Sequence, residues 1–159
     1  MTARVSVLFL NVGVDLRLTL CAQVEIEGVY PSFYDWPRAG DGEVFEIPRL
    51  RGRKPRFDLV ILDCGVEELP ERFFPWREPL AATLAEYGER PVLLTTHISV
   101  VNVLSNREKS RGMFSIRRIP QIHFAERDVD QVLAIIRQQK ERITAEPPDL
   151  SRRGPALTV

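Results

Sequence analysis

Residues 57–65 have the sequence Phe-Asp-Leu-Val-Ile-Leu-Asp-Cys-Gly, and this run indicates the architecture of the chain. It lacks the alternation of apolar and polar side chains that marks a strand with one solvent-exposed face. A continuous apolar run of this length is typical of a strand buried on both faces of a parallel sheet that helices cover. Ligands of such sheets collect at the carboxyl ends of the strands. Asp63 lies at that end and is therefore the first candidate functional residue.

Strand and helix patterns alternate along the rest of the chain. In addition to 57–62, we predict strands at 5–10, 29–34, 91–96 and 119–124. Helices are predicted at 15–27, 79–87 and 128–144, with a weak helix at 43–50 and an ambiguous polar segment at 98–118. The alternation predicts an α/β fold of three layers, with an open parallel sheet of five strands in the flavodoxin-like order 2-1-3-4-5. Pro31 suggests that the strand at 29–34 lies at an edge or that a strand starts there.

The domain organisation follows from the same patterns. We expect one domain over 1–144 and a disordered tail over 145–159, which begins near Pro147 and Pro148. In the first helix an apolar stripe that includes Cys21 predicts that this cysteine is a small core residue, and Gly28 is placed to cap the helix.

Composition excludes several classes of function. The chain of 159 residues has 22 basic and 22 acidic side chains, and this zero net charge argues against nucleic acid as a partner. Its two cysteines show no metal-binding spacing, which predicts a reducing compartment and no structural zinc. The apolar run at 5–10 is too short to span a bilayer. We therefore expect a cytoplasmic protein without membrane insertion, cofactor or bound metal.

The order of these segments resembles the receiver domains of bacterial response regulators. Residues 7–17 resemble the first strand of a receiver and the entry to its first helix, and residues 39–43, Ala-Gly-Asp-Gly-Glu, resemble the entry to its second helix. The strand that ends at Asp63 resembles the one that carries the phosphoryl-accepting aspartate. The resemblance covers residues 4–144 and is weakest between 99 and 120. It implies a receiver-like fold with Asp63 at the acceptor position.

The residues around that position depart from the receiver pattern. Receivers hold Mg²⁺ with two acidic residues after the first strand, and Asn11 and Val12 occupy those places here. The lysine that follows the fifth strand is matched by Ala125 and Glu126, with Arg127 one or two places late. Only Asp63 and Thr96 remain of the working set, with Asn11 as a remnant. The resemblance therefore implies a degenerate pseudo-receiver, not an enzyme, in which Mg²⁺-dependent phosphorylation fails.

Other interpretations remain open for these residues and for two groups of side chains. Asp63 could be a strand-end carboxylate that the nearby backbone hydrogen-bonds. Basic residues cluster at 49–56 and at 107–118 and could bind an anion or a nucleotide, or form solvated loops. Two aromatic segments, interpreted as loops, are expected to supply either core or a binding surface; they contain Tyr30, Phe33, Tyr34 and Trp36, and Phe73, Phe74 and Trp76.

The resulting hypothesis is a non-catalytic signalling or scaffolding module, related to two-component systems, that acts by contact with another protein. Interaction candidates are Arg117, Arg118, Trp76 and Trp36. A homodimer through residues 100–144 is a further candidate, because receivers commonly pair through this region. Two alternatives stay open: an atypical receiver phosphorylated on Asp63, and a small anion- or nucleotide-binding domain that uses the basic clusters.

Overall fold

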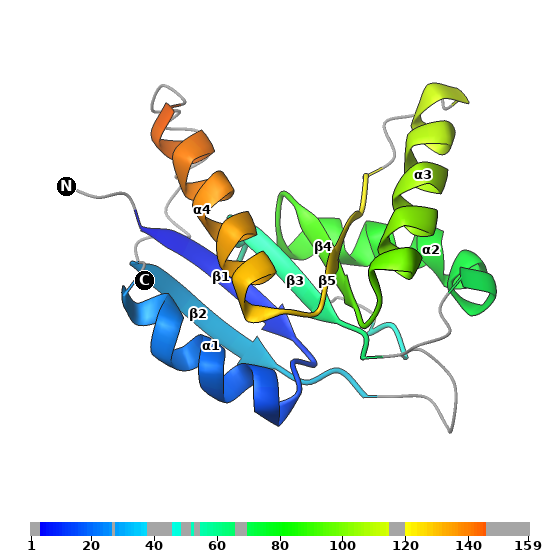
Figure 1. The fold of residues 1–159 in the computed structure, drawn as a ribbon. Coiled ribbons are helices and arrows are strands. Elements are labelled where there is room, and N and C mark those ends of the chain that lie inside the picture. The colour runs from blue at the N-terminus through cyan, green and yellow to red at the C-terminus, as the bar shows by residue number, and fades with distance from the viewer. Residues whose placement is uncertain are drawn as a thin grey trace.

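The computed structural model describes residues 4–26, 28–37, 46–48, 52, 55–65, 70–114 and 120–145. Its strands are β1 Val5–Leu10, β2 Val29–Tyr34, β3 Leu59–Asp63, β4 Pro91–Thr95 and β5 His123–Glu126. Its helices are α1 Val14–Ile26, α2 Pro70–Tyr87, α3 Ile98–Phe114 and α4 Val129–Ala145. All neighbouring strands are parallel, in the order β2-β1-β3-β4-β5 (Figure 1). The predicted fold class and strand order are confirmed.

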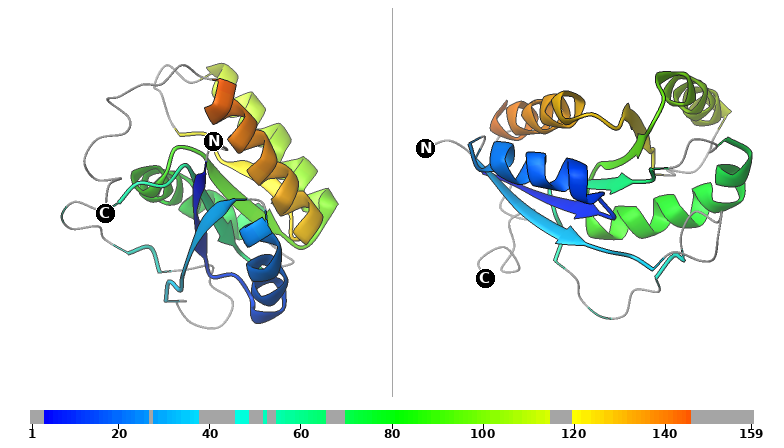
Figure 2. Two further views of the ribbon diagram at one scale, coloured as in Figure 1. Left: turned by 90° about the vertical axis from the view of Figure 1, so that its left-hand side faces the viewer. Right: turned by 60° about the horizontal axis from the view of Figure 1, so that its bottom comes forward.

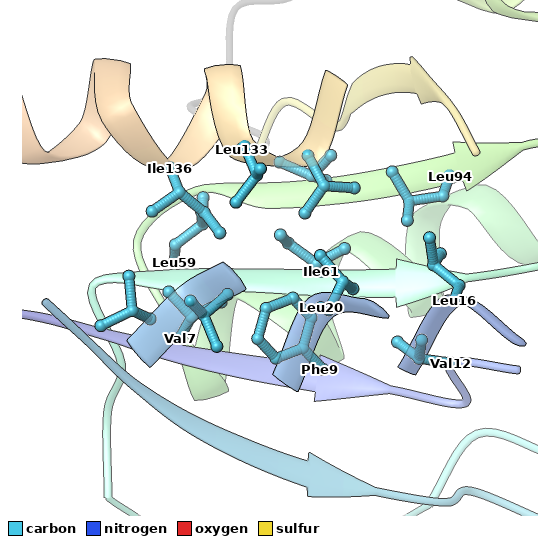
Figure 3. Packing of buried hydrophobic residues seen from close by; sticks show 14 of the residues in the cluster. Val7, Phe9, Val12, Leu16, Leu20, Leu59, Ile61, Leu94, Leu133 and Ile136 are labelled. Carbon is cyan, nitrogen blue, oxygen red and sulfur yellow. The ribbon is translucent and has the colours of Figure 1, made fainter. Parts of the chain in front are cut away.

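Helices cover both faces of the sheet and make it the middle of three layers. α1 and α4 lie on one face, and α2 lies on the other (Figure 2). Leu104 of α3 belongs to the same core cluster as the buried side chains of α2. Because successive side chains of a strand point to opposite faces, Val7 and Phe9 pack toward α1 and α4, whereas Leu8 and Leu10 pack toward α2. Figure 3 shows the first of these two cores, with Ile136 of α4 directly over the sheet.

β2 is an edge strand, as predicted, and Pro31 is placed where it weakens no hydrogen bond of the sheet. Val5 N–H donates to Gly28 O, and Asn11 N–H donates to Tyr34 O. The backbone groups of even-numbered β2 residues therefore face β1, since parallel pairing alternates along a strand. Pro31 is odd-numbered, so its missing N–H lies on the open edge. A proline there discourages the addition of a further strand.

The helix predicted at 79–87 was wrong at its N-terminal end. α2 begins at Pro70 instead of 79 and contains Pro75 and Pro79. Each interior proline removes a helical hydrogen bond, and this loss is offset by the burial of apolar side chains that include Phe73 and Leu80. The aromatic residues at 73–76 are thus part of a helix and not of a loop. The ambiguous segment at 98–118 contains the long helix α3.

The fifth strand lies later in the chain than predicted. The backbone groups of Pro120 and Ile122 form hydrogen bonds with side chains and not with β4. Arg77 donates to Pro120 O (2.8 Å), and Ile122 N–H donates to Glu108 (3.4 Å). Pairing with β4 starts only at His123. The strand expected at 119–124 is therefore observed at His123–Glu126.

Three smaller predictions have different outcomes. Cys21 is exposed and not a core residue, because it lies on the side of α1 away from the buried Leu16, Leu20 and Val24. Gly28 follows α1 with a φ of 72°, the left-handed conformation expected of a glycine at the end of a helix. The weak helix predicted at 43–50 lies mainly outside the described residues, and the described residues 46–48 are not helical. The predicted tail lies outside the described residues from 146 onward.

Candidate functional site

The carboxyl edge of the sheet brings together Asp63 and a cation that comes from a distant part of the chain. Asp63 ends β3 and is only 2% exposed. Its Oδ2 accepts hydrogen bonds from Gly13 N–H (3.2 Å) and from Arg127 Nε (2.8 Å). Arg127 is the first residue after β5, and its own N–H donates to Thr95 O (2.6 Å). The backbone of the β5–α4 turn therefore positions the guanidinium directly over the end of β3.

The same guanidinium also holds Asp15 in the first turn of α1. Its two terminal nitrogens donate to the two carboxylate oxygens of Asp15 at 3.0 and 2.8 Å. This bidentate geometry is the strongest form of arginine–carboxylate pairing. We call Arg127, Asp15 and Asp63 the Arg127 bridge; it connects the end of β3, the start of α1 and the turn after β5. A Cβ atom at Gly13 would lie 2.5 Å from a guanidinium nitrogen of Arg127, so a glycine permits this close approach.

The charges of the bridge reinforce each other. The hydrogen bonds from Arg127 are the main cause that holds the pKa of Asp15 well below its usual range. Its hydrogen bond to Asp15, followed by its hydrogen bond and charge interaction with Asp63, raises the pKa of Arg127 above its ordinary value. The ion pair between Asp15 and Arg127 therefore persists from mildly acidic to alkaline pH.

The residues at this edge do not fit Mg²⁺. A magnesium ion prefers several oxygen ligands in near-octahedral geometry. Asn11 has a φ of 55° and uses its Oδ1 to accept the backbone N–H of Trp36, so this oxygen is already committed to the chain after β2. Val12 is buried and apolar. Both nearby carboxylates bind Arg127, and within the described ranges no cluster of three or more His, Cys, Asp or Glu could hold a metal ion.

Two polar atoms near this edge have no hydrogen-bond partner although they are buried, namely Asp63 Oδ1 and Asn11 Nδ2. Thr96 is half-buried directly after β4, at the same edge as Asp63. The structure places Asn11, Asp63 and Thr96 at the carboxyl ends of the adjacent strands β1, β3 and β4. It assigns Asn11 a structural contact with the backbone of Trp36.

The predicted interaction residues have mixed positions. Trp36 is only 8% exposed and lines a pocket. Trp76 is half-buried on α2. Arg117 and Arg118 lie outside the described residues.

Sequence reasoning missed Asp15 and discounted Arg127. The available signals were a carboxylate in the first turn of α1 and a cation next to the fifth strand.

The second basic cluster is partly neutralised by contacts between α2 and α3. Arg77 is 4% exposed and forms a bidentate pair with Glu108, in which its terminal nitrogen lies 2.7 Å from Oε2. Arg111 pairs with Glu78 and Glu108. Arg107 stacks 4.1 Å from the centre of the Phe74 ring. Of these cluster residues, Arg111 is therefore neutralised by acids, whereas Arg107 keeps its charge. Much of the first basic cluster lies outside the described residues.

An apolar stripe on α1 lies beside the Arg127 bridge. Val14 is 74% exposed and Leu18 is 70% exposed, and Cys21 is also exposed. Their spacing of four and three residues puts them on one side of the helix. The opposite side of α1 is buried against the sheet through Leu16 and Leu20. This stripe is thus an apolar surface beyond the one that the fold uses.

Comparison with models of protein families, with curated proteins and with solved structures finds no match. The resemblance to receivers therefore stays a hypothesis that rests on the order of the segments and on the residues of the sheet edge. Among the described helices, none combines the length and the apolar character that crossing a membrane requires.

Proposed function

We propose that this protein is a non-catalytic, receiver-like module that acts by contact with another protein. The observation that carries the proposal is the Arg127 bridge. A guanidinium from the chain itself binds Asp63 and Asp15 at the edge where a working receiver needs a metal ion. In this proposal Asp63 holds parts of the fold together and does not accept a phosphoryl group.

The chemistry of phosphoryl transfer explains why the bridge favours this proposal. An acceptor carboxylate must present an oxygen to the incoming phosphorus, and cations must neutralise the charge on the phosphoryl oxygens. Asp63 is 98% buried, and its Oδ2 already accepts two hydrogen bonds. The charge of Arg127 is shared with Asp15, whose carboxylate would repel a phosphoryl group that approaches from the α1 side.

The α1 stripe supports contact with a protein. Exposed apolar side chains that form one side of a helix are typical of a protein-binding surface. Val14 of this stripe directly precedes Asp15, so the bridge fixes the end of the helix that carries it. A partner that binds the stripe would meet a preorganised helix.

Self-association through residues 100–144 is a second candidate. α3 exposes Val103 and Met113, which are 43% and 81% exposed. Sedimentation of the wild type and of a Met113→Glu variant over a range of concentrations tests this; a concentration-dependent dimer that the variant loses supports the second candidate.

Quantitative affinity capture from cells of the native host, followed by mass spectrometry, tests the main proposal. The baits are the wild type, Asp63→Asn, Leu18→Glu and Gln23→Glu. Gln23→Glu is the matched control, because it adds the same charge to an exposed position elsewhere on α1. We expect wild type, Asp63→Asn and Gln23→Glu to retain the same partner, and Leu18→Glu to lose it. Loss of the partner in a folded Asp63→Asn variant, with retention in Leu18→Glu, would favour the atypical phospho-receiver.

A further inference from the structure

A pocket on the other face of the sheet has the composition of a binding site. Its volume is about 320 Å³, which is within the range of small-molecule sites in proteins. Leu8 and Leu10 line it from β1, on the face that α2 covers. It lies toward the β2 edge of that face, since its remaining walls come from the chain after β2, the chain before β3 and the end of α2.

Four of the described residues that line the pocket are aromatic. Trp36 and Tyr87 have ring centroids 5.9 Å apart with a tilt of 49° between their planes, so the two rings are neighbouring, inclined walls. Phe57 and Tyr34 also line the pocket. Tyr34 is 63% exposed, so one of these rings is open to solvent.

Several backbone contacts hold these rings in place. Asn11 Oδ1 accepts the N–H of Trp36, which fixes the chain directly after β2. Phe57 N–H donates to Tyr87 O (2.7 Å), which ties the chain before β3 to the end of α2. The described walls of the pocket are therefore joined by hydrogen bonds between separate elements.

The charge of the pocket determines which ligand it suits. Among the described residues that line it, Asp35 is the only one with a charged side chain, and it is exposed at the start of the segment that leads to Trp36. Faces of Trp and Tyr rings attract cations, and clusters of such rings bind alkylated ammonium groups. A carboxylate beside these rings attracts the same cation through its negative charge.

We propose that this aromatic pocket binds a small organic cation with an alkylated ammonium group. The apolar substituents contact the rings and the two leucines, and Asp35 complements the charge. The same chemistry is offered by a free quaternary amine and by a methylated lysine side chain of a protein. The inference does not depend on the Arg127 bridge or on the proposed function.

Fluorescence of Trp36 measures this binding. The chain has two tryptophans, so Trp76→Phe leaves Trp36 as the only reporter. The probes are choline and its neutral isostere, in which a carbon atom replaces the ammonium nitrogen, with sodium chloride as the control for ionic strength. We expect a saturable change with choline and at least about tenfold weaker binding of the isostere. Equal or tighter binding of the isostere, or no saturable change with choline beyond that of sodium chloride, would overturn the proposal.

Variants locate the site. In the same background, Asp35→Asn should weaken choline binding about fivefold and Tyr87→Leu about tenfold, whereas Asp130→Asn, which removes an exposed acid from α4, should leave it unchanged. Because Asp35 is exposed, its variant is expected to fold, and circular dichroism checks each protein. Binding that Asp35→Asn and Tyr87→Leu leave unchanged would place the ligand elsewhere and refute the site. Tighter binding of a trimethyllysine peptide than of choline would identify the protein side chain as the source of the ligand.

Discussion

Removal of the Arg127 side chain should destabilise the protein more than removal of the Asp63 charge. Arg127→Met keeps an apolar stem but leaves the carboxylate of Asp63 buried without its cation. Asp63→Asn keeps an oxygen for Gly13 N–H, and Arg127 retains its pair with Asp15. The Asp63 side chain is 2% exposed and the Arg127 side chain is 19% exposed. An unpaired charge therefore destabilises the protein more on Asp63 than on Arg127.

The magnitude follows from the geometry of the pair. Unit charges about 4 Å apart interact by about 4 kcal/mol at an effective dielectric constant near 20, and loss of one partner of a buried pair costs about 3–5 kcal/mol. Because Arg127 is partly exposed, we expect about 3 kcal/mol for Arg127→Met. Asp63→Asn should cost about 1.5 kcal/mol, at the lower end of the range for one hydrogen bond to a charged group.

The double variant provides the sharper test. Arg127→Met combined with Asp63→Asn has neither a buried charge nor a cation to pair with it, so it should lose only about 2 kcal/mol and be more stable than Arg127→Met alone. Arg142→Met is the matched control on α4. Its pair with Glu89 is 30% exposed on both sides, and its loss should cost less than about 1 kcal/mol.

Urea unfolding at neutral pH, followed by circular dichroism, measures these free energies. Equal stabilities of Arg127→Met and Asp63→Asn would contradict the prediction. A double variant that loses the sum of the two single losses would contradict it as well. Additive losses would mean that the two side chains do not interact in solution.

Four further predictions concern the rest of the fold. Burial acts to raise the pKa of Glu108, but hydrogen bonds and charge from Arg77 and Arg111 lower this pKa below the usual 4.5. The pair of Arg77 and Glu108 should therefore stabilise the fold above that pH and lose this contribution as the pH falls. Glu108→Gln should accordingly reduce the acid sensitivity of unfolding and cost about 3 kcal/mol near neutral pH, measured by urea titration at several pH values. Phe73→Ala should lower the free energy of unfolding by about 3–5 kcal/mol, because Phe73 is 1% exposed. Gly28→Ala forces a φ of 72° on an L-residue and should cost about 1–2 kcal/mol by the same assay. Deletion of residues 146–159 should shift the thermal midpoint by no more than a few degrees, about 1 kcal/mol for a chain of this length; a much larger drop would show that the tail packs on the domain.

The sheet could be predicted from the sequence because its central strands are buried on both faces. Leu59 and its successors form a contiguous apolar run, which distinguishes a strand of this kind from one at a solvent-exposed face. The start of α2 was missed because Pro75 and Pro79 argue against a helix, and the burial that outweighs them is a property of the folded protein. The exposure of Cys21 was missed because α1 is apolar on more than one side.

The position of Asp63 at the sheet edge could be predicted from the sequence, but its partner could not be identified. Arg127 was discounted because the fifth strand was predicted to end at 124. Since β5 ends at Glu126, Arg127 is in fact the first residue after the strand. The shift arises because side chains of Arg77 and Glu108 bind the chain just before β5, and these tertiary contacts leave no local signal.

The most direct test of the central claim is whether Asp63 accepts a phosphoryl group. Wild type, Asp63→Asn and Arg127→Met are incubated with acetyl phosphate and Mg²⁺, and the intact mass of each is measured. The wild type is expected to keep the mass of the unmodified chain, because Arg127 binds the acceptor and Mg²⁺ lacks ligands. A wild-type protein that gains one phosphoryl group, with no gain in Asp63→Asn, would contradict the claim.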